Sequence, residues 1–354
     1  MINIISPINQ LGYGIAGLNI VKALHRISDI ALWPIGQPQV TNQQDAEIIS
    51  ALIKNNQYPN FNASCIRIWH QHDMSQFIGK GQHIGFPIFE LDKFSDLEKH
   101  HLSSLDKIFV CSKWAQQVIL ENLDIDHSQV IVVPLGVDVS IFSPCEIQNN
   151  NKTIFYNCGK WEIRKGHDIL VDIFNKAFEP KDNVELWMMC DNPFLKPHET
   201  QQWIDLYKSS KLGSKIKILP RLNTQQEVYN IMSQVDCGIF PSRAEGWNLE
   251  LLELMACGKH TIATNYSAHT EFCNKENSYL VDIQDSELAK DGKWFFGQGN
   301  WAKLRHNHID QFASIMKEIH LLKLTNKLAI NKAGIDTANR FTWLNTAEII
   351  NNNV

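Results

Sequence analysis

Short apolar runs alternate with amphipathic stretches along this chain, and this alternation constrains its fold more than any other feature. The apolar runs end at polar residues, glycine or proline, as buried strands do, and the stretches between them repeat apolar residues at helical spacing. A regular order of strand and helix predicts a parallel sheet covered on both faces, the α/β class. The expected strands are Ile2–Ser6, Ile30–Pro34, Ser64–Trp69, Gln82–Phe89, Lys107–Cys111, Val130–Pro134, Thr153–Cys158, Val184–Met189, Ile216–Leu219, Val235–Phe240 and Thr261–Thr264.

The length of the chain calls for two such arrays. At 354 residues the chain exceeds one ordinary core, so two domains are expected. The best linker candidate is the patch Asn149–Asn151, which follows Ser143-Pro144, and a new strand begins at Thr153. Each half can then form its own sheet, and we expect the two arrays to face each other across a cleft. A last helix is expected from Phe341 to Ile350.

Composition narrows the class of protein. The net charge of −5 argues against a broad surface for nucleic acid or anionic membranes, because phosphates demand basic patches. The eight cysteines are scattered without a C-x-x-C pair, and most lie in apolar runs, so we expect reduced core thiols in a cytoplasmic protein. The N-terminus lacks the features of a signal peptide, and no run of about 18 apolar residues predicts a transmembrane segment.

The stretch from Phe240 to Gly258 joins a strand to a helix through a polar loop. Asn248 is a good N-cap for this helix, and Gly258 suits its end. The start of a helix beyond a strand presents unpaired N–H groups and a positive dipole end, which favour a phosphate or another anion. Two carboxylates bracket this junction, Glu245 in the loop and Glu253 in the helix. We expect Glu253 to face away from the apolar stripe of the helix.

A second candidate anion site follows the strand Thr153–Cys158. The loop Gly159–Gly166 contains three cations, Lys160, Arg164 and Lys165. Such a loop can hold a diphosphate, because arginine offers a planar fork and lysine a point charge. A solvated charge cluster is the alternative, but the flanking glycines and the position after a strand favour anion binding.

Polar residues also follow strands of the first half. Glu90 comes after Gln82–Phe89, where open sheets place catalytic or sugar-binding groups, and a helix cap or a salt bridge explains it equally well. Gly12-Tyr13-Gly14, after the first strand, is a weak anion-binding signal that a tight turn also explains. His70 and His72 have no third metal ligand nearby, so polar loop contacts are favoured over a metal site.

Taken in order, these motifs resemble those of the retaining glycosyltransferases of family 4, the glycosyl transferases group 1, which have the GT-B fold of two Rossmann-like βαβ domains. The resemblance spans nearly the whole chain, and the ordered set is far more specific than the pair of glutamates alone. The residues that carry it are Gly12-Tyr13-Gly14, Cys111-Ser112-Lys113-Trp114, Val133-Pro134-Leu135-Gly136-Val137-Asp138, Gly159-Lys160, Arg164-Lys165-Gly166, Phe240-Pro241-Ser242, Glu245-Gly246, Glu253, Ala256-Cys257-Gly258 and Phe341-Thr342-Trp343.

The resemblance implies a division of the chain. Residues 1–146 would bind the acceptor, residues 147–335 would bind the nucleotide sugar, and the helix within 336–354 would return to the first domain. The donor would be a nucleoside-diphosphate sugar, linked to UDP or GDP. Transfer would proceed with retention at the anomeric carbon and without a metal or other cofactor, because cations and a helix dipole stabilise the leaving phosphate.

The resemblance also implies roles for matched residues. Lys160 and Lys165 would hold the diphosphate with Arg164 beside them, and Gly14 would let the first domain approach it. The backbone N–H groups of the loop before the helix would face the diphosphate as well. The expected donor-binding residues are Gly14, Arg164, Arg221, Leu222, Gly246, Trp247, Asn248, Leu249 and Glu253, of which Arg221 and Leu222 would line the base.

The resemblance implies a different role for each of the two carboxylates, Glu245 and Glu253. Glu245 would contact hydroxyls of the transferred sugar, and Glu253 the ribose hydroxyls. The expected catalytic residues are Glu245, Lys165, Lys160 and Glu90.

The chain departs from the family pattern at three positions. Many relatives have histidine where this chain has Glu90, which leaves its role open between hydroxyl contact and help with the acceptor proton. Lys160 replaces the more frequent arginine, so a point charge replaces a bidentate grip. Trp247 stands where other residues are more usual, so the donor-sugar pocket is expected to differ.

The acceptor stays open among a glycan, a lipid-linked sugar, a small molecule and a modified nucleic acid. Two other functions also stay open at this point. A nucleotide-sugar epimerase or a phosphorylase shares the GT-B architecture, and an epimerase would turn over its nucleotide sugar without an acceptor. A non-catalytic nucleotide-sugar-binding subunit would have no need of the cations and glutamates, which counts against it.

Overall fold

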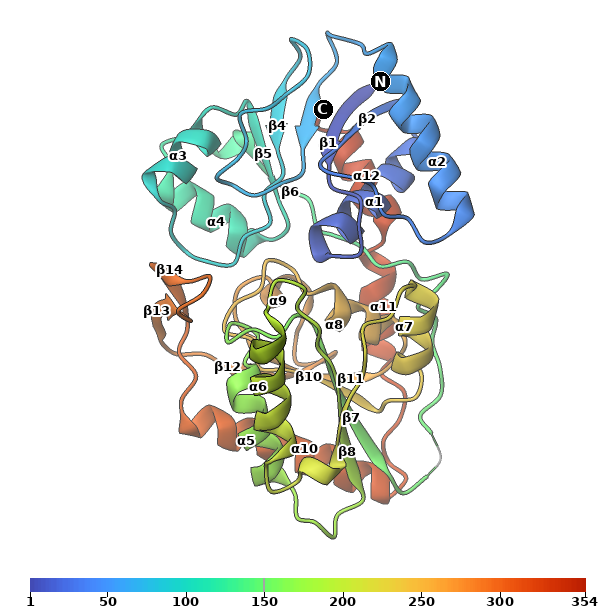
Figure 1. Ribbon diagram of the computed structural model, residues 1–354, viewed down its shortest axis with the longest axis vertical. Helices are drawn as coiled ribbons and strands as arrows, with labels where there is room; N and C mark the ends of the chain where they lie inside the picture. The colour runs from blue at the N-terminus through green and yellow to red at the C-terminus, as the bar shows by residue number, and fades with distance from the viewer. Residues whose placement is uncertain (149) are drawn as a thin grey trace. The chain divides into compact units, whose positions relative to one another are not determined.

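The chain forms two compact units in a computed structural model that describes residues 1–148 and 150–354 (Figure 1). Unit 1 comprises Met1–Asp138 and Arg340–Val354, and unit 2 comprises Val139–Asn339. The division thus falls before the expected linker patch, whose first residue, Asn149, lies outside the described residues.

Unit 1 is built on a parallel sheet. Within its described residues, six strands pair in the order β2-β1-β3-β4-β5-β6. The strands are β1 (Ile2–Ser6), β2 (Ile30–Pro34), β3 (Cys65–Arg67), β4 (His83–Gly85), β5 (Lys107–Val110) and β6 (Val130–Val132). The helices are α1 (Gly12–His25), α2 (Gln43–Lys54), η1 (Asn55–Gln57), α3 (Asp96–Ser103), α4 (Lys113–Asn122), η2 (His127–Gln129) and α12 (Trp343–Asn351).

The last helix of the chain belongs to unit 1. Helix α12 packs against α1, and the Thr346 Oγ1 donates a hydrogen bond of 2.7 Å to the carbonyl of Pro134. An isolated bridge also pairs Val137 with Thr342. Gly136 permits this close approach, because a Cβ there would lie 2.2 Å from the backbone nitrogen of Trp343.

Unit 2 repeats the architecture. Its parallel sheet contains six strands among the described residues, in the order β12-β11-β10-β7-β8-β9. The strands are β7 (Thr153–Cys158), β8 (Val184–Met189), β9 (Ile216–Ile218), β10 (Cys237–Phe240), β11 (His260–Asn265) and β12 (Tyr279–Asp282), and an antiparallel hairpin adds β13 (Ser286–Lys290) and β14 (Phe296–Ala302). The helices are α5 (His167–Ala177), α6 (Pro197–Lys208), η3 (Gly213–Lys215), α7 (Gln225–Met232), α8 (Leu249–Ala256), α9 (His269–Phe272), α10 (His306–Leu324) and α11 (Lys332–Arg340).

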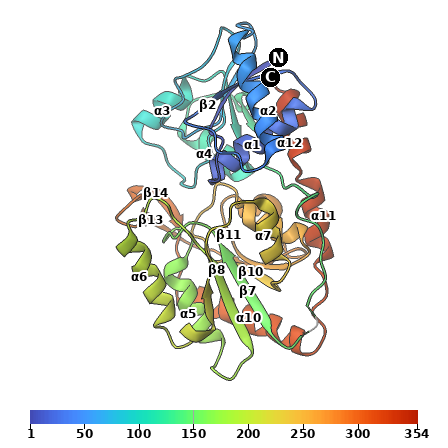
Figure 2. The same cartoon turned by 45° about the vertical axis from the view of Figure 1, so that its right-hand side comes forward.

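Helices cover both faces of the unit 2 sheet. Figures 1 and 2 place α5 and α6 on one side of this sheet and α7 on the other. Strands β7 and β10 are buried throughout, as the central strands of a covered parallel sheet must be. The core joins these strands to α5 and α10 through residues such as Phe155, Phe174 and Phe312. The alternation of strand and helix therefore gives the predicted pair of Rossmann-like domains.

Most elements lie within a few residues of the prediction, and local signals explain why. Ser112 caps α4 by accepting a hydrogen bond from the Ala115 N–H, and Gly258 ends α8 at a φ of 72°. Apart from short 3-10 helices, six features were not predicted: α2, α9, α10, α11, β12 and the β13–β14 hairpin. Helix α10 nevertheless repeats apolar residues at helical spacing, at Ile309, Phe312, Met316 and Ile319, and β12 begins with a short apolar run, so these signals were present in the sequence and were missed. Throughout the described ranges, no helix has the length and apolar character that crossing a membrane requires.

Candidate functional site

Two loops of unit 2 meet at the carboxyl ends of adjacent strands. Strands β7 and β10 are parallel neighbours, so the loop after each one leaves the same edge of the sheet. Gly166 allows the two loops to touch, since its φ is 74° and a Cβ there would lie 2.0 Å from the Pro241 carbonyl oxygen. The Arg243 N–H also donates to the carbonyl of Arg164 at 2.7 Å. The cations and Glu245, which are about 80 positions apart in sequence, are thereby brought together.

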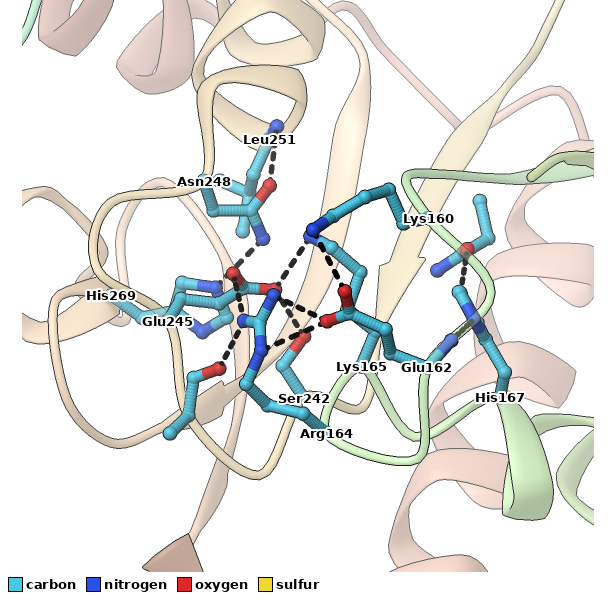
Figure 3. A network of polar contacts seen from close by, with 12 residues as sticks. Lys160, Glu162, Arg164, Lys165, His167, Ser242, Glu245, Asn248, Leu251 and His269 are labelled. Carbon is cyan, nitrogen blue, oxygen red and sulfur yellow. Dashed lines mark hydrogen bonds and ion pairs between the residues drawn. The ribbon is translucent and has the colours of Figure 1, made fainter. Parts of the chain in front are cut away.

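Glu245 is the centre of this cluster, which Figure 3 shows. One carboxylate oxygen accepts hydrogen bonds from the Lys165 Nζ at 2.9 Å and the Ser242 Oγ at 2.8 Å. The other accepts from the Arg164 Nη1 at 2.7 Å. The Glu245 side chain is only 5% exposed, so both ion pairs are shielded from water. A carboxylate has about four acceptor positions, so one remains for a further donor.

A second carboxylate, Glu162, holds the remaining cation. It pairs with Lys160 at 2.9 Å and accepts from the Nε and Nη2 of Arg164. The Arg164 guanidinium thus joins both carboxylates, while the Lys160 side chain is 38% exposed. Three cations and two carboxylates leave the cluster with an excess of one positive charge, and Lys160 is its most accessible cation.

Mutual attraction keeps these groups ionised. Burial alone would raise the pKa of Glu245, but the charges of Lys165 and Arg164 outweigh it and hold the pKa well below its usual range. Burial would lower the pKa of Lys165, and Glu245 and Glu250 instead raise it. Burial, then Lys165, lowers the pKa of His167 to about 3. Neutral His167 accepts from the Glu162 N–H and contacts the Asn157 side chain, which fixes the loop on β7.

The first turn of α8 is fixed by a buried histidine. Asn248 has a φ of 87°, and its side chain caps the helix by accepting from the Leu251 N–H at 3.2 Å, as predicted. Its amide nitrogen lies 2.8 Å from the Nε2 of His269. The Nδ1 of that ring lies 3.0 Å from the carbonyl of Thr264, so Nδ1 carries the hydrogen and Nε2 accepts. Asn248 and His269 therefore fix the conformation of the backbone at the start of α8.

Glu253 contrasts with Glu245. It was expected on the polar side of α8, but Leu251–Ala256 are all buried and Glu253 is only 7% exposed. Across the described parts of the chain, no N–H, hydroxyl or cation donates to its carboxylate. Burial, with a contribution from Glu250, raises the pKa of Glu253 well above its ordinary value. Its carboxyl group thus has acceptor capacity that the described residues do not use.

The remaining expected donor residues lie around the same edge of the unit 2 sheet. Gly246 is buried, and Leu249 is half-buried at the start of α8. The Trp247 ring is 3% exposed and packs on Phe272 with ring centroids 4.8 Å apart, so it lies beneath the loop. Arg221 and Leu222 follow β9 and are half-buried.

Two expected site residues belong to unit 1. Gly14 is buried in α1, where a Cβ would lie 2.2 Å from the Asn9 side chain. Glu90 is half-buried in the segment after β4. Tyr13 fixes this segment, because its hydroxyl accepts from the Ile88 N–H at 2.8 Å. Burial raises the pKa of this phenol, and the charge of Glu90 adds to the increase.

Sequence patterns did not point to most of the residues that support the cluster. Arg243 forms a bidentate ion pair with Asp168, at 2.7 and 2.8 Å, and so ties the β10–α8 loop to α5. The Ser267 hydroxyl accepts from the Glu245 N–H at 2.9 Å. Only Glu162 had a local signal, its position between Lys160 and Arg164. In the described part of the chain, no three His, Cys, Asp or Glu side chains group as metal ligands.

A family model described as glycosyl transferases group 1 matches residues 152–291, which contain both loops of the cluster. This part of unit 2 is thus similar to the group 1 glycosyltransferases. The serotype-specific mannosyltransferase WbdA of Escherichia coli is 22% identical to the chain over 276 residues, 70% of this chain and 33% of WbdA. The chain therefore spans about a third of the length of this curated relative.

Solved structures extend the glycosyltransferase fold over both units. Sucrose-phosphate synthase from Thermosynechococcus elongatus matches 99% of this chain and 97% of its own, with a TM-score of 0.72 and 15% identity. HepE of Anabaena, in complex with UDP and glucose, matches 99% and 98% with a TM-score of 0.71 and 14% identity. Both units together therefore have the GT-B fold that the motifs predicted.

Proposed function

We propose that this protein transfers a sugar from a nucleoside-diphosphate sugar to a hydroxyl acceptor, with retention of the anomeric configuration and without a metal. The observation that carries the proposal is the convergence of Lys160, Lys165 and the start of α8 around Glu245, at the carboxyl edge of the unit 2 sheet. Retention and the use of a UDP- or GDP-linked donor rest on the likeness to group 1 glycosyltransferases. The reduced cysteines fit a cytoplasmic enzyme.

Positive charge at this edge suits the leaving group. When the glycosidic bond of the donor breaks, negative charge develops on the diphosphate, and preorganised donors stabilise that charge most strongly. Lys160 is accessible and belongs to a cluster with excess positive charge, and Lys165 stays protonated because Glu245 raises its pKa. The N–H groups at the start of α8 add partial positive charge. Arg164 is saturated by two carboxylates, so we assign it to positioning Glu245.

The two glutamates suit different hydroxyls. Glu253 is a buried acceptor that receives no donor from the described residues, and a ribose diol supplies two hydroxyl donors. Glu245 has one acceptor position left and is fixed in place, which suits a single hydroxyl of the transferred sugar. Arg221 and Leu222, after β9, would line the base, and Glu90 of unit 1 would contact the acceptor.

The proposal is tested by nucleotide-sugar binding followed by transfer. UDP- and GDP-linked sugars are screened for an increase in the melting temperature, because a ligand of the native state stabilises it as the logarithm of concentration over Kd. The donor found is then incubated with candidate acceptors under excess chelator, and the linkage of the product is read by NMR. We expect a retained anomeric configuration. An inverted product, a requirement for added divalent cation, or no stabilisation by any nucleotide sugar would refute the proposal.

A further inference from the structure

The β13–β14 hairpin presents aromatic side chains beside the cationic loop. Trp294, in the turn of the hairpin, is 40% exposed, and Phe194, in the loop after β8, is 52% exposed. Their rings form an edge-to-face pair with centroids 6.0 Å apart. The Nζ of Lys160 lies 5.6 Å from the centre of the Phe194 ring. These two rings, which we call the aromatic shelf, thus adjoin the accessible cation of the donor site.

The shelf is held rigidly, although it is exposed. Asp291 accepts hydrogen bonds from the N–H groups of Lys293, Trp294 and Phe295, which fixes the turn. Lys293 pairs with Glu199 of α6 at 2.5 Å, which ties the turn to the body of unit 2. At its other end, the hairpin is bound to the loop that carries Glu245.

That second attachment links the shelf to the candidate site. The Ala302 N–H donates to the carbonyl of Arg243 at 2.9 Å. The Arg243 guanidinium lies 5.8 Å from the ring of Trp301, which is 2% exposed. The hairpin is therefore anchored two residues before Glu245, and the shelf has a fixed position relative to the reacting end of the donor.

We propose that the aromatic shelf is an acceptor subsite that stacks a pyranose ring of a glycan. One face of a pyranose is a set of C–H groups, which pack on the negative face of an aromatic ring, while its rim of hydroxyls requires polar partners. Lys293 and Glu199 supply such partners beside Trp294. The inference rests on the proposed function, because it takes Lys160 to mark the donor.

Two other occupants are distinguished by the test. The nucleotide base is assigned to Arg221 and Leu222, which follow β9, the neighbour of β8, so a response of the shelf to UDP or GDP alone would identify the base as its occupant. A membrane surface would use the most exposed apolar side chain of the hairpin, Phe296, at 68%. Phe296 lies opposite Lys290 in the hairpin pairing and is no part of the shelf.

The test reads Trp294 directly in the full-length protein labelled with 5-fluorotryptophan. Its ¹⁹F resonance is the one lost in Trp294→Phe. We expect this resonance to shift on titration with mannotriose, maltotriose or chitotriose, and to be unchanged by UDP or GDP alone. Phe194→Ala should weaken trisaccharide binding about tenfold, the loss expected for one stacked ring. Phe296→Ala is the matched control and should bind as the wild type does.

Three results would overturn the subsite. The Trp294 resonance would respond to none of the three trisaccharides, or it would respond to UDP or GDP alone, or it would respond to vesicles of anionic phospholipid with a loss in Phe296→Ala. Stabilisation by UDP or GDP is recorded on the same samples. A shelf that binds trisaccharide in a protein that no nucleotide stabilises would contradict the proposed function and leave the subsite standing. Nucleotide binding without any trisaccharide response would overturn the subsite and leave the proposed function standing.

Discussion

Glu245 and Glu253 bracket the start of one helix, yet their surroundings are opposite. Glu245 accepts from two cations and a hydroxyl, and these charges lower its pKa. Glu253 is equally buried, receives no donor from the described residues, and its pKa is raised by burial. The first is arranged to be ionised and immobile without a ligand. The second is costly to ionise until a ligand supplies donors. One loop and helix thus combine a preorganised anchor with an open binding position.

Replacing the anchor should have the largest effect. Glu245→Gln leaves Arg164 and Lys165 buried with one counter-charge fewer, and breaking a buried pair in this way costs roughly 3–5 kcal/mol. We expect a lower urea midpoint and loss of transfer even where the variant is fully folded. Urea unfolding monitored by circular dichroism measures the first, and product formation well below the midpoint measures the second.

The control for that variant is a glutamate of the same unit in a surface pair. Glu179 pairs with Lys211, and its side chain is 61% exposed, so Glu179→Gln should change the free energy of unfolding by less than about 1 kcal/mol. If Glu245→Gln is as stable as this control, the buried ion pairs are not what fixes Glu245.

Replacing Glu253 should change the free energy of unfolding in the opposite direction. In Glu253→Gln, a neutral group occupies a site where ionisation is unfavourable, so the free energy of unfolding at neutral pH should rise. Affinity for UDP or GDP should fall roughly tenfold or more, because hydrogen bonds from hydroxyls to a charged acceptor are lost. Unfolding in urea and calorimetric titration measure the two quantities. A variant with lower stability and unchanged nucleotide affinity would show that Glu253 is an ordinary buried residue.

The accessible cation should give the smallest change in stability. Lys160 is 38% exposed and pairs only with Glu162 in this cluster, so Lys160→Ala should alter the free energy of unfolding by less than about 1 kcal/mol. Its nucleotide affinity should nevertheless drop, and Lys160→Arg should restore it, since arginine also binds phosphate. Titration of UDP and GDP into both variants checks this. Equal affinity in Lys160→Ala and the wild type would remove Lys160 from the donor site.

The sequence predicted those features that depend on residues close together in the chain. The alternation of strands and helices, the cap at Asn248 and the end of α8 at Gly258 follow from residues a few positions apart, and the structure confirms them. The different surroundings of the two glutamates depend on distant residues. Arg164 and Glu245 are 81 positions apart, and only the parallel pairing of β7 with β10 brings their loops together. A helical wheel placed Glu253 on a polar side, because it could not show that α8 is buried all round.

The same limit explains the supporting residues. The Arg243–Asp168 pair and the contact of Tyr13 with Ile88 span 75 positions each, and no pattern in the chain relates their members. The hairpin of β13 and β14 was missed because its strands contain mainly polar residues and glycine, so they lack the apolar alternation typical of strands. It nevertheless carries the aromatic shelf.

The difference between the two glutamates predicts a pH dependence for nucleotide binding. Ribose hydroxyls donate best to an ionised Glu253, whose pKa in the free protein is raised, so binding should release a proton and affinity should increase with pH. The stability of the free protein should change the other way. Because the folded pKa of Glu253 exceeds the unfolded value, its contribution to the free energy of unfolding falls as pH rises between the two.

The most direct measurement is calorimetric titration of UDP and GDP in two buffers with different ionisation enthalpies, across about pH 5 to 8, with the wild type and Glu253→Gln. The difference in apparent enthalpy between the buffers gives the number of protons released on binding. We predict a release by the wild type that Glu253→Gln abolishes, together with weaker binding by that variant. Equal proton release and equal affinity in the two proteins would contradict the assignment of Glu253 to the ribose of the donor.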